Sequence, residues 1–143
     1  MLLFKYCLLI TFLTLVSIKD FKTREIPDYF HILIASLALI DFKPILSFTG
    51  LLCALPFMIV AILSKGKGLG GADIKFMMAI GFVLGLSKGL MVGMIGLLAF
   101  ILFSIIKDSG EEKVSYPMIP FLSLGVIWAI LLNRQFINLF LYI

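Results

Sequence analysis

The chain has 143 residues, of which 62% are hydrophobic and only 14% are charged, and its formal net charge is +4. Its mean hydropathy of +1.20 is well above that of soluble domains, which are about half apolar. Too few polar residues remain to cover a water-facing globule, so the composition excludes a soluble protein and predicts an integral membrane protein. We expect the lipid bilayer as a partner and no nucleic acid.

Charge clusters and prolines divide the chain into six apolar stretches, at about residues 2–18, 29–42, 45–63, 73–86, 89–106 and 117–132. In hydrocarbon every backbone amide must be paired within its own segment or in a closed barrel. These stretches lack the alternating pattern of barrel strands. The sequence therefore predicts an all-α, polytopic protein, in which residues 1–143 form one compact domain of six transmembrane helices.

Lysine and arginine residues indicate how these helices are oriented, because cells retain them on the cytoplasmic side of a membrane. Eight of the twelve fall on one face of the predicted bundle, in or near the loops at residues 19–28, 64–75 and 107–116. We therefore expect a multi-pass protein of the cell membrane with both termini outside. The three loops would share the cytoplasm, and two aspartates, Asp20 and Asp73, lie on them.

The stretch "GKGLGGADIKF", residues 66–76, brings Asp73 to the start of the fourth apolar segment. A helix over residues 73–86 is only about 21 Å long, against a hydrocarbon core of roughly 30 Å. Either the bilayer thins there, or the glycine-rich stretch dips into the bundle and carries Asp73 below the surface. Acidic groups at that depth are commonly functional. The simpler alternative is that Asp73 caps a helix and that the glycines only add flexibility.

Asp20 closes the first apolar stretch within "SIKDFKTREIP". The simplest interpretation is an interfacial anchor, in which Arg24 pairs with Asp20 one helical turn away and Pro27 then ends the helix. Together with Asp73, however, Asp20 can form a pair of carboxylates at one face of the bundle. Two such groups share a proton, because the charge of one raises the pKa of the other.

A carboxylate pair can activate water without a metal or a covalent nucleophile. The chain has one histidine, His31, and two cysteines, Cys7 and Cys53, that both lie in apolar runs. These residues cannot supply the ligands of a zinc site, so we expect no metal and no cofactor. If the protein is an enzyme, the residue types favour carboxylate chemistry.

Three motifs resemble those of a known family, in the same order along the chain. They are "KDFKTREIPDYF", an aspartate followed by an Ile-Pro pair; "GLGGADIKF", a form of G-x-G-D-x-K; and "YPMIPFLSLG", with Ile-Pro-Phe at the start of the last helix. The chain resembles the type IV prepilin peptidases and the archaeal preflagellin peptidases, which are membrane aspartyl proteases. The likeness covers about residues 10–130.

This resemblance implies that Asp20 and Asp73 are the catalytic pair and that Gly70 and Gly71 allow the backbone and a substrate to approach closely. Ala72 stands where the motif usually has its second glycine. If that position needs a positive φ, alanine costs of order 1 kcal/mol. The other motif residues that would shape the loops or bind the substrate are Arg24, Pro27 and Lys75.

The resemblance also implies a substrate, namely a prepilin or pilin-like precursor with a short basic leader that ends in glycine and is followed by a hydrophobic helix. Cleavage would follow that glycine on the cytoplasmic side. We expect the short form of the family, without the cysteine-paired domain associated with N-methylation. The alternative is a small transporter or assembly subunit that binds an ion through Asp73 or the loop amides.

Overall fold

The computed structural model describes residues 2–65, 69–107 and 116–132. All regular structure within these ranges is helical, which confirms the predicted all-α class. The helices are α1 (Leu2–Thr23), α2 (Asp28–Ser36), α3 (Pro44–Gly50), α4 (Ala54–Leu63), α5 (Gly71–Leu84), α6 (Leu86–Lys107) and α7 (Ile119–Leu131). Two 3₁₀ turns, η1 (Leu37–Asp41) and η2 (Leu51–Cys53), extend α2 and join α3 to α4.

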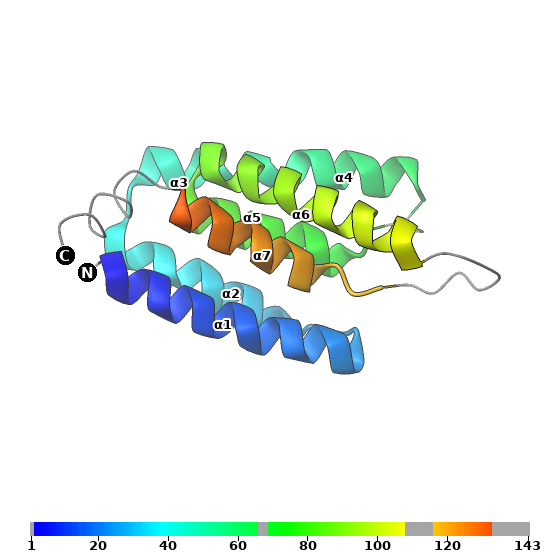
Figure 1. Ribbon diagram of the computed structural model, residues 1–143. Helices are drawn as coiled ribbons and strands as arrows, with labels where there is room; N and C mark the ends of the chain where they lie inside the picture. The colour runs from blue at the N-terminus through cyan, green and yellow to red at the C-terminus, as the bar shows by residue number, and fades with distance from the viewer. Residues whose placement is uncertain (1, 66–68, 108–115, 133–143) are drawn as a thin grey trace.

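The helices lie side by side along one axis and alternate in direction (Figure 1). Helices α1, α3, α4 and α6 run one way, and α2, α5 and α7 run back. As a result, the last turns of α1, α4 and α6 lie at the same end of the bundle as the first turns of α2, α5 and α7. The segments that contain Asp20 and Asp73 therefore meet at one end, as the sequence predicted.

Helix α1 ends differently from the expectation. We expected Pro27 to end it, but α1 stops at Thr23. Arg24 has a φ of +53°, in the left-handed region, and its N–H donates to the carbonyl oxygen of Asp20 at 3.1 Å. This left-handed residue closes the helix. Pro27 instead has extended backbone and comes directly before α2.

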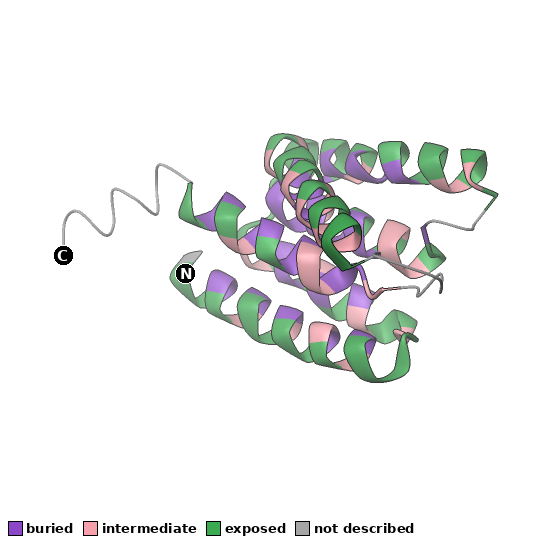
Figure 2. Cartoon of the chain, turned by 45° about the vertical axis from the view of Figure 1, so that its right-hand side comes forward, coloured by how far each residue is buried: buried purple, intermediate pink, exposed green. Residues whose placement is uncertain are grey.

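Two helical segments, Pro44–Leu63 and Leu86–Lys107, are long and apolar enough to cross a membrane. Their outward faces carry large apolar side chains, among them Ile45, Leu63 and Ile106, each more than three-quarters exposed. Figure 2 shows that exposed residues cover the outer sides of the bundle while buried ones face inward. Such a surface suits hydrocarbon better than water.

Six membrane crossings with both termini outside remain a prediction. The described ends of the three basic loops lie at one end of the bundle. Three of the basic residues that were counted to predict the orientation, Lys67, Lys113 and Arg134, lie outside the described residues.

Helix α5 lies at the centre of the bundle, where it packs against α2, α3, α4 and α6. Phe76, Met77 and Ile80 on its inner face are completely buried. These residues follow one another at helical spacing, so they form a single stripe that faces the core. Because Asp73 continues the same stripe toward the N-terminus, the central helix holds this carboxylate on its buried side.

Helices α3 and α5 approach each other closely where Gly50 faces Gly81. A Cβ atom on either glycine would overlap the carbonyl oxygen of the other. Small residues allow such close backbone contact, which is typical of helix pairs in membranes. The position of α5, and thus of Asp73, depends on this contact.

We expect Gly81→Ala to destabilise the fold by about 1–3 kcal/mol or more, because backbone atoms cannot move aside as a flexible side chain can. The thermal unfolding midpoint in detergent, followed by circular dichroism, measures the effect. Gly71→Ala is the matched control, since a Cβ there meets nothing within 4 Å. Equal midpoints for the two variants would contradict the packing argument.

Candidate active site

Asp20 lies in the last turn of α1 and is only 7% exposed. Its Oδ2 atom accepts a hydrogen bond from the backbone N–H of Ile119 at 3.2 Å. Ile119 is the first residue of α7, so Asp20 pairs one of the free amides at that helix start. Asp20 lies just outside the first expected membrane span, residues 2–18. Burial raises the pKa of Asp20, and the Ile119 amide and the charge of Arg24 oppose this rise.

Asp73 lies in the first turn of α5, but it is not the N-cap residue that the simpler alternative required. Gly70 occupies the N-cap position, and Asp73 is the third helical residue. Its Oδ2 accepts a hydrogen bond from the N–H of Gly70 at 3.1 Å. This is one half of a capping box, the half that a glycine N-cap permits. Asp73 is partly buried.

The two carboxylates lie within electrostatic range of each other, so that the charge of Asp20 acts on Asp73. They come from α1 and α5, which are far apart in sequence. Arg24 also lies within electrostatic range of Asp20, but no ion pair joins the two among the described residues. The predicted anchor pair between Asp20 and Arg24 therefore contributes a distant charge and not a direct contact.

Within the described residues, the backbone of the glycine motif is helical from Gly71 onward and needs no left-handed residue. Ala72 lies in the first turn of α5 and does not have a positive φ, so its methyl group costs no strain. Gly70 and Gly71 are exposed, and a Cβ on either would meet no atom closer than 3.5 Å. The packing of the chain does not require glycine at these two positions. Their lack of side chains leaves the backbone beside Asp73 open.

Lys75 does not join the two aspartates. Its Nζ lies 2.7 Å from Oδ1 of Asp28, and both side chains are more than half exposed. The hydrogen bond and the charge of Lys75 lower the pKa of Asp28. Lys75 follows Asp73 by two residues, so the two side chains point about 200° apart around the helix. The predicted substrate-binding lysine thus lies on another face of α5.

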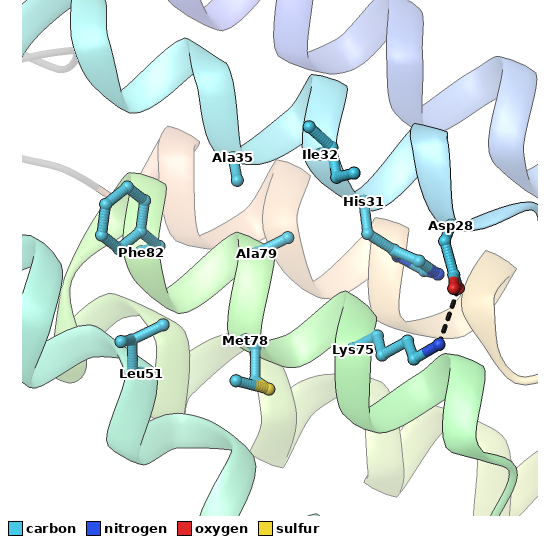
Figure 3. Close-up of a pocket in the computed structure, with 9 residues that line it drawn as sticks. All are labelled: Asp28, His31, Ile32, Ala35, Leu51, Lys75, Met78, Ala79 and Phe82. Atoms are coloured by element: carbon cyan, nitrogen blue, oxygen red, sulfur yellow. Dashed lines mark hydrogen bonds and ion pairs between the residues drawn. The ribbon is translucent and has the colours of Figure 1, made fainter.

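Lys75 and Asp28 lie at one end of a groove of about 460 Å³ between α2, η2 and α5, shown in Figure 3. Ile32, Met78 and Phe82 supply apolar walls. The groove also contains His31, which is 6% exposed and whose two ring nitrogens have no hydrogen-bond partner among the described residues. Burial of these nitrogens disfavours the charged imidazolium form of His31.

A second groove, of about 430 Å³, runs between α1 and α7. It extends from Ile10 to Phe21 along α1, which is about 16 Å at the helical rise. Its lining includes Ser17 and Ser123, whose hydroxyl groups bond each other at 3.1 Å. Ser17 is about one turn before Asp20, and the lining residues Phe21 and Pro120 adjoin Asp20 and its donor Ile119 in sequence, so one end of the groove lies near the buried carboxylate.

A comparison with protein families identifies a match. The model of the type IV leader peptidase family matches residues 7–106, more than half of the chain. The chain belongs to the type IV leader peptidase family. The matched region contains both aspartates and the glycine motif. No curated protein and no solved structure matches the chain.

The family match identifies a peptidase but ends before α7, the helix that supplies the amide partner of Asp20. Sequence reasoning placed an Ile-Pro-Phe motif at the start of the last helix and did not assign Ile119 a role. Proline early in a helix marks positions where amides lack helical partners. That signal could have indicated Ile119 as a donor, although only the fold brings it to Asp20.

Proposed function

We propose that this leader peptidase family member is an aspartyl endopeptidase in which Asp20 and Asp73 together activate a water molecule. One observation carries the proposal: two partly or fully buried carboxylates from separate helices lie within electrostatic range at one end of the bundle. Each carboxylate accepts one hydrogen bond from a backbone N–H group. The family match favours this function over a transporter or an assembly subunit.

The chemistry requires one proton on the pair. The ionised carboxylate takes a proton from water, and the water oxygen attacks the peptide carbonyl carbon. The protonated carboxylate gives its proton to the carbonyl oxygen. Collapse of this intermediate breaks the C–N bond, and the amine leaves with a proton from the pair. Burial raises the pKa of Asp20, which helps this pair to retain its shared proton.

The proposed substrate is a prepilin or pilin-like precursor, cut after a glycine on the cytoplasmic side, with a hydrophobic helix after the cut. The open backbone at Gly70 and Gly71 supports close approach of the substrate main chain to Asp73. Basic residues near the same end of the bundle support the cytoplasmic assignment.

We further propose that the hydrophobic helix of the substrate lies in the groove between α1 and α7. One end of this groove is lined by Phe21 and Pro120, the sequence neighbours of Asp20 and of its hydrogen-bond donor Ile119. The other large groove, beside α2, lies on the face of α5 that carries Lys75, Met78 and Phe82, away from Asp73. Nearness to Asp20 favours the α1/α7 groove.

Asp20→Asn and Asp73→Asn should each lower processing at least about 100-fold, because an amide can neither take nor give the catalytic proton. Co-expression with a leader-bearing precursor measures this as a leader-sized mass loss. Asp28→Asn is the matched control, since its exposed ion pair lies at the same end of the bundle and should change processing less than about five-fold. Efficient cleavage by either active-site variant, present in the membrane at normal amounts, would refute the pair.

The groove assignment predicts that Thr14→Trp blocks processing of the precursor, because Thr14 is exposed and lines the α1/α7 groove. Ala35→Trp fills the other groove to a similar extent and should leave processing near the normal level. Initial cleavage rates at equal membrane amounts of both variants give the comparison. Loss of processing in the Ala35 variant alone would move the substrate to the α2/α5 groove.

A further inference from the structure

Three lysines gather at the end of the bundle opposite the carboxylate pair. Lys5 of α1, Lys43 before α3 and Lys88 of α6 line one small cavity of about 60 Å³. Asp41 is the one carboxylate in the lining among the residues that the structure describes, and the buried Ser47 adds a hydroxyl group. None of these residues belongs to the proposed active site.

Lys5 is the buried member, with only 5% of its surface exposed. Its Nζ donates to the carbonyl oxygen of Val83 at 3.4 Å, near the C-terminal end of α5. A cation is favourable at that helix end. One long hydrogen bond leaves an ammonium group with two further hydrogens to donate. Lys5 is therefore fixed by α5 and still has donor capacity toward the cavity.

The cavity has an excess of positive charge. Lys43 and Lys88 both lie within electrostatic range of Lys5, and of each other. Asp41 offsets one of the three charges through its contact with Lys43, at 3.9 Å. Lys88 also lies in the first turn of α6, where the helix dipole is positive and disfavours a cation. Without an anion, these like charges repel one another.

We propose that this cavity binds a phosphate group, carried by an anionic lipid headgroup or by a free phosphate ion. A water molecule needs about 10–15 Å³ of such volume, so the cavity has room for roughly four oxygen-sized groups, the number in a phosphate. Ammonium groups form strong, charge-assisted hydrogen bonds to phosphate oxygens. An anion there would offset the charge excess and link α1, α3 and α6.

The test measures thermal unfolding of the full chain in two arms. In the first, detergent-solubilised protein is titrated with inorganic phosphate against sodium chloride at equal ionic strength. In the second, nanodiscs of phosphatidylglycerol are compared with nanodiscs of phosphatidylcholine. The variants are Lys43→Gln with Lys88→Gln, and a control of Lys22→Gln with Lys107→Gln, which removes two exposed lysines from the opposite end.

We expect the anion to raise the unfolding midpoint of the wild type and the control, and the double variant at positions 43 and 88 to lose about 10-fold or more in affinity. Saturable stabilisation by inorganic phosphate assigns a free ion. Stabilisation by phosphatidylglycerol alone assigns a lipid headgroup. Equal responses of the two double variants, or no response in either arm, would overturn the proposal.

A second readout separates binding from a purely structural role. Without phosphate, in neutral detergent, Lys88→Gln should raise the unfolding midpoint, because it removes a like charge from the cavity. With saturating anion, the same variant should fall below the wild type. A variant that is less stable than the wild type under both conditions would make Lys88 a structural residue and refute the site.

Discussion

The arrangement of this protein depends on keeping two carboxylates ionisable at one end of an apolar bundle. A buried carboxylate is costly unless backbone or side-chain donors stabilise it. The chain meets this constraint with helix-start amides: Ile119 donates to Asp20, and Gly70 donates to Asp73. The first bond joins α1 to α7, and the second fixes Asp73 to the start of α5. The same hydrogen bonds therefore stabilise the fold and orient the proposed catalytic groups.

The central helix, α5, carries Asp73 and packs against most of the other helices. Helix α5 can lie against α3 at very short range because Gly50 and Gly81 have no side chains. Its buried stripe then aims Asp73 at the interior, and its opposite face supplies one wall of the groove that contains His31. One end of the bundle carries the acidic pair, whereas the other carries the lysine cavity. Polar groups are thus concentrated at the two ends of an otherwise apolar body.

The positions of the helices and the meeting of the two aspartate segments at one end of the bundle could be predicted from the sequence. Apolar stretches bounded by charges and prolines located the helices, because a chain in hydrocarbon must form helices where it cannot pair with a neighbour. The glycines before Asp73 and the charges around Asp20 indicated the two segments where we propose the site. Their convergence followed from an alternating bundle that brings three connections to one end.

What the sequence could not give depends on contacts between distant segments. The left-handed Arg24, which ends α1, has no local signal, since arginine has no special preference for that conformation. The bond from Ile119 to Asp20 and the ion pair from Lys75 to Asp28 join residues far apart in the chain. The sequence could state the cost of Ala72 only on the condition of a positive φ, and the helical turn at this residue does not meet that condition.

The central claim is that Asp20 and Asp73 share one electrostatic environment. The most direct measurement is a pH titration of the side-chain carboxyl ¹³C resonances of aspartate in the wild type and in Asp20→Asn, with the protein in micelles. The charge of Asp20 disfavours ionisation of Asp73. The account predicts that the pKa of Asp73 falls when Asp20 is replaced, whereas those of Asp28 and Asp41 do not move. An unchanged titration of Asp73 in a folded variant would contradict it.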